Sequence, residues 1–273
     1  MDLKTGSKGQ EVIRLQRSLN LVNYLYSKSA ILVADGDFGQ KTKNKVCDYQ
    51  RYNSLVPNGI VNRLVQRLLG IEILPGIDVS VYQGDIDWAK INDVHFVFAK
   101  ASEGKSFRDP TLKANYTGAK SRGIPFGVYH FANYRSTYGI ELENFLKAIS
   151  KIGKMELPPV LDVEDPNHKL SPGQVLDWTL AWLASVEGQL GRKPIVYTGP
   201  GYFNKYLNGG KGLENYPLWV AHYGTMQPSV PKAWKQWDIW QWSGEQHIAG
   251  IDEHNHVDTN WIVPGGLQRL MAL

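Results

Sequence analysis

From Gly76 onward the chain repeats short apolar segments, which are separated by turn residues or by amphipathic helical patterns. Such segments predict β-strands, and their alternation with helices predicts parallel βαβ units. Eight of them follow one another, at residues 77–80, 95–101, 126–131, 160–164, 195–198, 218–222, 239–242 and 257–260. Helix signals are strong between the early strands and weak between the later ones. We therefore predict an α/β fold, an eight-stranded (β/α) barrel with several helices missing.

Two of the intervening helices have clear end signals. Asp109 followed by Pro110 predicts a capped helix start, and Gly123 predicts the end of that helix. Ser171 begins a capping-box pattern for a longer helix, which Gly191 should end.

The fourth predicted strand lies in the stretch Pro-Pro-Val-Leu-Asp-Val-Glu-Asp-Pro, residues 158–166. Because side chains alternate along a strand, Asp162 and Glu164 should face the same side. Like charges held this close do not both ionise easily, so the pKa of one carboxyl should be raised. One protonated and one ionised carboxyl is the pair that glycoside hydrolysis requires. The pattern is short and common, so a solvated pair of acids at a strand end remains the alternative.

In a barrel of this type the functional groups lie at the C-terminal ends of the strands. The polar and aromatic residues at these positions are Asp78, Tyr129, Asp162, Glu164, Tyr197, Trp219, Gln241 and Asp258. Four carboxyl groups should converge there. The aromatic residues offer flat apolar faces for sugar rings, and we assign Trp219 and Trp242 to that role among the nine tryptophans.

Charge and tryptophan content divide the chain in two. Residues 1–75 hold 11 Lys and Arg against 6 Asp and Glu, whereas all nine tryptophans come after residue 75. We predict a domain over residues 1–70, a linker over 71–76 and the barrel over 77–273. The single Cys47 cannot form an internal disulfide, so both domains must be held by packing.

The first domain shows three short helical patterns, each preceded by turn residues. Its motifs G-S-x-G-x-x-V-x-x-L-Q-x-x-L, D-G-x-F-G-x-x-T and N-G-I-V resemble the type 1 peptidoglycan-binding domain over residues 4–70. The resemblance implies a small three-helix domain that anchors the protein to bacterial peptidoglycan. A basic module also suits a polyanionic wall by charge alone. Nucleic acid is not an expected partner, because no recognised nucleic-acid motif is present.

The larger domain resembles the glycoside hydrolase family 25 lysozymes. The matching motifs, in order over residues 76–263, are G-I-D-V-S, F-V-F-A-K-A-S-E-G, G-V-Y-H-F, P-V-L-D-V-E, W-V-A-H-Y, W-Q-W and V-D-T-N. This resemblance implies N-acetylmuramidase activity, the hydrolysis of the β-1,4 bond between N-acetylmuramic acid and N-acetylglucosamine. It implies Glu164 as general acid and base and Asp162 as second catalytic carboxylate. Asp78 and Asp258 match the other active-site acids, and no cofactor is expected.

The resemblance leaves the nucleophile open. It implies retention of anomeric configuration, either through a protein carboxylate or through the 2-acetamido oxygen of the substrate, oriented by Asp162. A protein nucleophile would place the two carboxyl groups about 5–5.5 Å apart.

Two other functions compete. Asp252, His254, His256 and Asp258 are spaced so that a strand would bring them together around Zn²⁺, but a zinc site normally has a recognised scaffold, and we expect no metal. A wall-binding lectin without turnover is the second alternative, and the complete set of four acids argues against it.

Residues 1–6 lack the basic start and apolar run of a secretory signal, and no window approaches the roughly 18–20 apolar residues of a membrane span. We expect a monomer made in the host cytoplasm that does not insert stably in the membrane. Because its substrate lies outside the cytoplasm, we expect release of the phage endolysin kind, through a holin-type membrane lesion, although a bacterial autolysin or toxin with another export route stays open.

Overall fold

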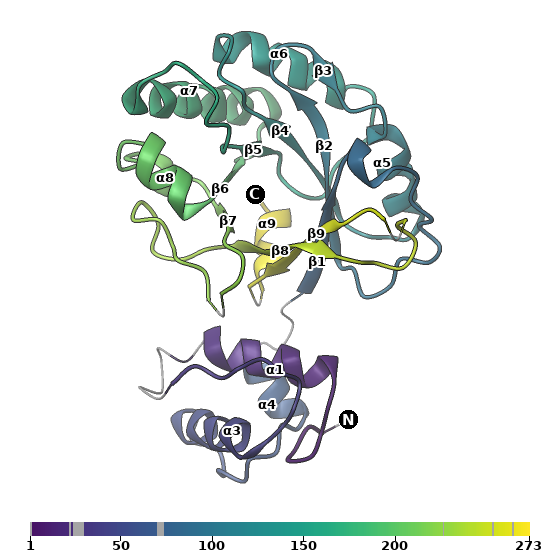
Figure 1. Ribbon diagram of the computed structural model, residues 1–273, viewed down its shortest axis with the longest axis vertical. Helices are drawn as coiled ribbons and strands as arrows, with labels where there is room; N and C mark the ends of the chain where they lie inside the picture. Colours follow the sequence, from purple (N-terminus) through teal and green to yellow (C-terminus); the bar gives the residue numbers. More distant parts are fainter. Residues whose placement is uncertain are drawn as a thin grey trace. The chain divides into compact units, whose positions relative to one another are not determined.

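The computed structural model describes residues 2–21, 23, 30–69, 74–225, 227–252, 254–263 and 265–273 (Figure 1). The chain divides into two compact units, one formed mainly by residues up to 73 and one by residues from Leu74 on. The first part of the predicted linker, residues 71–73, lies outside the described residues. Its last part is not linker: residues 74–76 belong to strand β1 (Leu74–Val79), where they pair with residues 260–262.

The small unit contains the helices α1 (Gln10–Leu21), α3 (Gln40–Tyr52) and α4 (Arg63–Leu68) in its described part. Their apolar faces meet in one core that includes Val12, Leu15, Phe38 and Val46. A buried glutamine holds the turn before α3, since Gln16 donates to the Asp35 carboxylate and accepts from the backbone N–H of Gly36. The helical patterns therefore fold as predicted.

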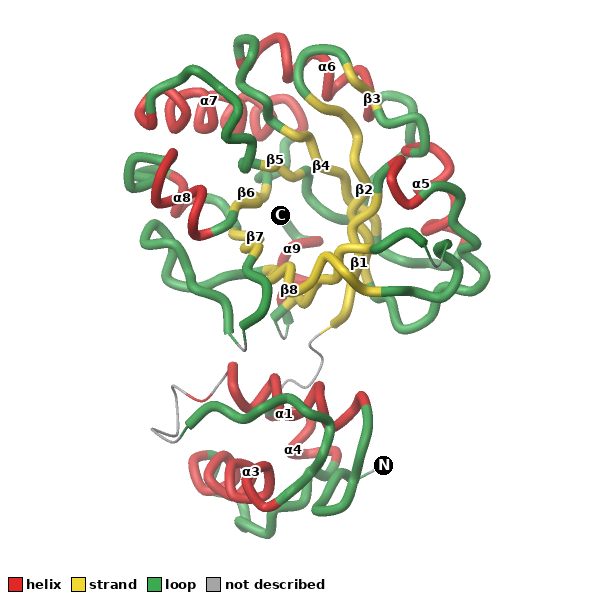
Figure 2. The backbone as a smooth tube through the Cα atoms, in the orientation of Figure 1, coloured by secondary structure: helices red, strands yellow, loops and turns green. Residues whose placement is uncertain are grey.

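The large unit is a closed barrel (Figure 2). Its strands are β1, β2 (Phe96–Glu103), β4 (Phe126–Phe131), β5 (Val160–Asp162), β6 (Ile195–Thr198), β7 (Leu218–Ala221), β8 (Ile239–Gln246) and β9 (Val257–Ile262). They hydrogen-bond in the order β1-β9-β8-β7-β6-β5-β4-β2, and a β1–β2 pairing closes the ring. The two-residue strand β3 (Phe107–Arg108) pairs antiparallel with the C-terminal end of β2. The predicted eight-stranded α/β barrel is confirmed.

The helices surround the early strands and are sparse around the later ones (Figure 1). They are α5 (Leu112–Ser121), α6 (Tyr138–Ile149), α7 (Pro172–Leu190), the short α8 (Pro200–Tyr206) and the C-terminal α9 (Gly266–Met271), with one-turn helices η1 (Val81–Gln83) and η2 (Leu213–Asn215). The described parts of the β7–β8 and β8–β9 connections contain no α-helix. Within the described chain, no helix combines the length and the apolar character that crossing a bilayer requires.

The end signals were correct for the longer helix and for the C-terminal end of the shorter one, which Gly123 follows with a positive φ, and wrong only for the start of the shorter one. Ser171 and Gln174 form the predicted capping box of α7, and Gly191 ends it in the left-handed conformation. Helix α5, in contrast, is capped by Thr111, because the Asp109 carboxylate bonds to the N–H and the hydroxyl of Thr111 and holds a turn before the helix begins.

Strand β9 departs from the predicted parallel arrangement. It runs antiparallel to both β1 and β8, because the short β8–β9 connection reverses the chain instead of crossing over the barrel. The N-terminal end of β9 therefore lies at the rim where the other strands have their C-terminal ends. Asp258, the second residue of β9, reaches that rim for this reason.

Aromatic and aliphatic side chains fill the barrel interior. The core includes Phe96, Phe98 and Trp219 from the strands and Leu267 and Leu270 from α9. Close packing restricts the residues opposite the two phenylalanines: a Cβ added to Gly76 would lie 2.3 Å from the Phe96 ring, and one added to Gly127 would lie 2.4 Å from the Phe98 ring. The packed interior leaves a pocket at the C-terminal rim of the parallel strands.

Candidate active site

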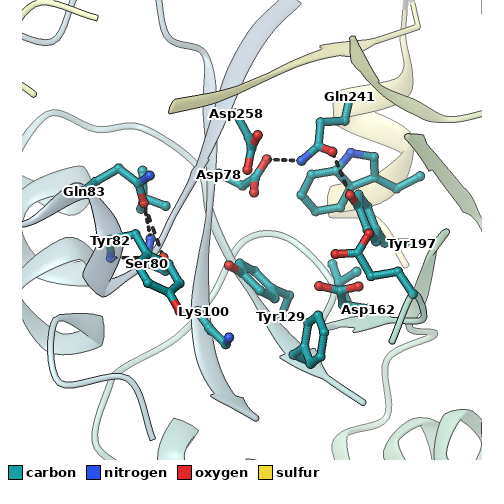
Figure 3. Close-up of a pocket in the computed structure, with 15 residues that line it drawn as sticks. Asp78, Ser80, Tyr82, Gln83, Lys100, Tyr129, Asp162, Tyr197, Gln241 and Asp258 are labelled. Carbon is teal, nitrogen blue, oxygen red and sulfur yellow. Dashed lines mark hydrogen bonds between the residues drawn. The ribbon is translucent and has the colours of Figure 1, made fainter. Parts of the chain in front are cut away.

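One pocket collects all eight residues that the strand-end analysis named (Figure 3). Its lining consists of Asp78, Val79, Ser80, Tyr82, Gln83, Lys100, Tyr129, Phe131, Val160, Asp162, Glu164, Tyr197, Trp219, Gln241 and Asp258. Strands β1, β2 and β4–β9 each contribute at least one side chain. Four carboxyl groups thus lie in a single concave site, partly removed from water.

Asp78 and Asp258 form a pair across two strands. They are directly opposite each other in the β1–β9 ladder. Burial raises the pKa of Asp78 to about 6, and burial together with the Asp78 charge raises that of Asp258 to about 8. A carboxyl that keeps its proton near neutrality can donate a hydrogen bond to its ionised neighbour, so the two groups share one proton.

Asp162 and Glu164 occupy another part of the pocket. Strand β5 ends at Asp162, two residues earlier than predicted, and Glu164 lies in the loop that follows. Burial and the Glu164 charge raise the pKa of Asp162 well above its usual value. Asp162 Oδ1 is buried and has no hydrogen-bond partner among the described residues, so it is available to a bound molecule.

Glu164 is more open than Asp162. Solvent reaches its side chain beyond the strand end, yet the surrounding protein desolvates its carboxyl enough to raise its pKa. The Tyr197 hydroxyl opposes this increase and the Asp78 charge adds to it. An accessible carboxyl with a raised pKa is suited to give a proton to a substrate and to take one back.

Lys100 supplies the positive charge of the pocket. It is the only basic side chain among the described lining residues, and it lies buried on β2. Its ammonium donates to Glu103 at 2.6 Å and lies over the Phe131 ring. Lys100 lowers the pKa of both Asp162 and Glu164, which favours an ionised carboxyl in this part of the pocket.

A hydrogen-bonded network of side chains from the neighbouring strands holds the Asp78 carboxylate in place. Gln241 Nε2 and Asn260 Nδ2 both donate to Asp78 Oδ2, at 3.0 and 2.7 Å. Gln241 Oε1 accepts from the Tyr197 hydroxyl at 2.7 Å, and Asn260 Oδ1 accepts from the Trp219 indole at 2.8 Å. Each amide thus has both ends bonded, so the network holds a single orientation of Asp78.

The aromatic assignments need correction. Only 2% of Trp219 is exposed, so its ring forms the floor of the pocket against Phe98 and Tyr197 and offers no broad face to a sugar. Trp242 lies outside the pocket lining and packs against Trp261. The pocket's most exposed aromatic residue is instead Tyr82.

The residues of the metal alternative do not share a strand. Asp252 and His254 lie in a turn, where the Asp252 carboxylate accepts the His254 N–H, and the His256 ring packs at a tilt against that of His247. Only Asp258 lies on β9. Among the described residues, no group of three or more His, Cys, Asp or Glu side chains is arranged so that it could hold a metal ion.

Among the residues that sequence analysis missed, four bear directly on the site, two of them in the pocket lining and two bonded to residues that line it. Lys100 could have been noticed as a lone charge in an apolar strand, and Asn260 shares a face with Asp258 by simple alternation. Tyr223, whose hydroxyl donates to Gln241, lies in a loop. Tyr82 lies in the one-turn helix η1. Neither element has a periodic sequence pattern that could have identified these residues.

The raised pKa of Asp258 predicts that this residue destabilises the fold near neutral pH. In the unfolded chain it ionises near pH 4, whereas in the fold it ionises near pH 8, so stability is lost as the pH rises between these values. Because Asn cannot ionise, Asp258→Asn should raise Tm by about 4–8 °C at pH 8, corresponding to about 2 kcal/mol after allowance for partial exposure. At pH 4 the two melting curves should coincide. A gain that is independent of pH would show that ionisation is not the cause.

Two protein-family models match this chain. The family model for glycosyl hydrolases family 25 matches residues 77–251, and that of a peptidoglycan binding domain matches residues 8–69. Asp258 and Asn260 lie beyond the first match, on the strand that closes the barrel.

Individual relatives agree with these matches. Lysozyme M1 of Streptomyces globisporus is 32% identical over 209 residues, which make up 72% of this chain and 70% of that protein. The crystal structure of a lysozyme from Streptomyces coelicolor is 32% identical, with a TM-score of 0.66 over 73% of this chain and 96% of that one. The catalytic domain of endolysin ply40, from bacteriophage P40 of Listeria monocytogenes, is 25% identical, with a TM-score of 0.63 over 74% and 98% of the two chains.

Proposed function

Because the chain belongs to glycosyl hydrolases family 25, we propose that its pocket hydrolyses the β-1,4 bond between N-acetylmuramic acid and N-acetylglucosamine in peptidoglycan. The observation that carries this proposal is the convergence of four carboxyl groups with raised pKa in one pocket at the rim of the barrel. The similarity to Lysozyme M1 supports the same activity.

In the proposed reaction, Glu164 gives its proton to the glycosidic oxygen as the bond to the anomeric carbon breaks. The oxocarbenium-like sugar is then stabilised by negative charge near Asp162, whose unbonded Oδ1 can face it or accept the N–H of the 2-acetamido group. Glu164, now ionised, removes a proton from the water that completes hydrolysis and so regains its initial state.

In this proposal, other lining residues hold the catalytic carboxyl groups in position and determine their charge. Asp78 and Asp258 share a proton, and Gln241 holds Asp78 while receiving a hydrogen bond from Tyr197. Tyr129 faces the acids, and burial raises its pKa well above the usual value, so it stays a hydrogen-bond donor.

The decisive experiment is product analysis on purified peptidoglycan, with new reducing ends and new free amines measured in parallel. Muramic acid at the reducing ends, absent with Glu164→Gln, is the expected result. Glucosamine at the reducing ends would indicate another glycosidase specificity, and free amines would indicate peptide cleavage. Binding without products would favour a lectin.

We propose further that the small unit holds the enzyme on the wall, since its family match is a peptidoglycan binding domain and the excess of positive over negative charge in the chain lies in its first 75 residues. Deletion of residues 1–70 should weaken adsorption to cell walls, most strongly at low salt, where charge attraction is least screened. Activity should fall more on whole walls than on short soluble fragments. An equal loss on both substrates would show that the unit supports the barrel structurally.

The similarity to the catalytic domain of a phage endolysin supports a proposed route to the substrate, in which a monomer made in the host cytoplasm reaches the wall through a membrane lesion. Expression in a bacterial host with and without a holin tests it, because lysis should require the holin. Size-exclusion chromatography tests whether the protein is a monomer in solution.

A further inference from the structure

Tyr82 is the most exposed aromatic side chain of the pocket lining. Its exposed fraction is 77%, although it lines the same pocket as the four acids. An aromatic ring left this open gains free energy when a flat apolar surface covers it. The roles proposed for the other lining residues leave this ring unused.

Buried polar groups hold the backbone of this tyrosine on both sides. Tyr82 is the middle residue of η1, whose capping box joins Ser80 and Gln83. The N–H of Val81 donates to the buried Asp109 carboxylate at 2.8 Å. The Gln83 side-chain amide donates to the carbonyl of His256 at 2.8 Å, which ties the turn to the residue before β9. The ring is therefore exposed, but the backbone that carries it is fixed.

The ring lies away from the reacting groups. Figure 3 shows Tyr82, Ser80 and Gln83 on one side of the pocket and Asp162 and Tyr197 on the other, with Asp78 and Asp258 between them. A molecule that reached from Asp162 to Tyr82 would have to extend across the pocket. In a glycan strand, the part that does so is a sugar next to the one attacked.

We propose that Tyr82 is the platform of a separate sugar-binding subsite, where its ring packs against the apolar face of a neighbouring saccharide unit. The inference rests on the proposed glycan substrate and adds the place where the strand is held beyond the cleaved bond. A fixed backbone lowers the entropy lost on binding, because only two side-chain torsions of Tyr82 remain to be ordered.

The test uses the full chain and peptidoglycan oligosaccharides of increasing length. Tyr82→Ala should lower kcat/KM about tenfold on long oligosaccharides, mainly through KM, and leave the shortest cleaved one unchanged. Tyr82→Phe should behave as the wild type, because the ring face is retained. Tyr138→Ala is the matched control, since Tyr138 is 39% exposed and lies outside the pocket lining.

The other outcomes overturn the inference. Equal loss on short and long substrates would place the ring at the reacting sugar, and loss in Tyr82→Phe would assign the effect to the hydroxyl group. No change in Tyr82→Ala would remove the platform. Calorimetric binding of long oligosaccharides in the Glu164→Gln background repeats the comparison without turnover, so a failure of the proposed reaction is distinguished from a failure of the subsite.

Discussion

Glu164→Gln is expected to lower kcat on peptidoglycan by about 10²–10⁴-fold, because glutamine has nearly the same shape but cannot donate or accept the transferred proton. The side chain lies beyond the end of β5 and its pKa is raised by desolvation, so replacement with the neutral glutamine should not lower the melting temperature. Reducing ends released per unit time measure the effect, and circular dichroism measures the fold.

Glu245→Gln is the matched control, since Glu245 is an exposed glutamate on β8 outside the pocket lining. It should keep full activity. Aryl glycosides with an acidic leaving group need little protonation, so the loss with Glu164→Gln should be smaller on them. Wild-type activity in Glu164→Gln would exclude Glu164 as the acid, and an equal loss on both substrates would indicate a defect other than proton donation.

The second large effect, a loss of stability, is expected on replacement of Glu141. This fully buried residue of α6 accepts hydrogen bonds from His130, from the N–H of Asn133 and from the Ser136 hydroxyl. Burial lowers the pKa of His130, so the ring is neutral: it donates from Nε2 to Glu141 and accepts at Nδ1 from Ser102. Glu141→Ala leaves these donors unpaired and should destabilise the barrel by about 3–5 kcal/mol, roughly 6–20 °C in Tm.

Glu143→Ala provides the comparison on the same helix. Glu143 is exposed, its side chain at 64%, and it forms a surface ion pair with Lys147 one turn further on. A surface pair of this kind contributes less than about 1 kcal/mol, so the melting temperature should barely move. Similar shifts in the two variants would mean that helix α6, and not the buried network, determines the loss.

The strands of the barrel were predictable because burial on one or both faces requires apolar residues in short runs or at alternating positions, and these patterns are visible in the sequence. The pair Asp162 and Glu164 was found by alternation, although the strand ends at Asp162 and Glu164 reaches the pocket from the loop. The capping box at Ser171 was found because its two bonds are local. Signals of this kind depend on residues that are near one another in the chain.

The missed features depend on residues far apart. The direction of β9 follows from a short connection and from pairing with β1, some 180 residues earlier, and no local pattern contains that information. Asn260 and Gln241 meet at Asp78 only in the closed barrel. Trp219 looked like a sugar-stacking residue because exposure cannot be read from residue type.

The antiparallel strand β9 has a consequence for how activity arises during folding. It pairs with β8 on one side and with β1 on the other, so the ring stays open until β9 has joined it. The same segment delivers Asp258 opposite Asp78 and brings Asn260 to the Asp78 carboxylate. The site is therefore incomplete without β9: a refolding chain should gain enzymatic turnover only once this strand has docked, and a partly folded form that lacks it should be inactive.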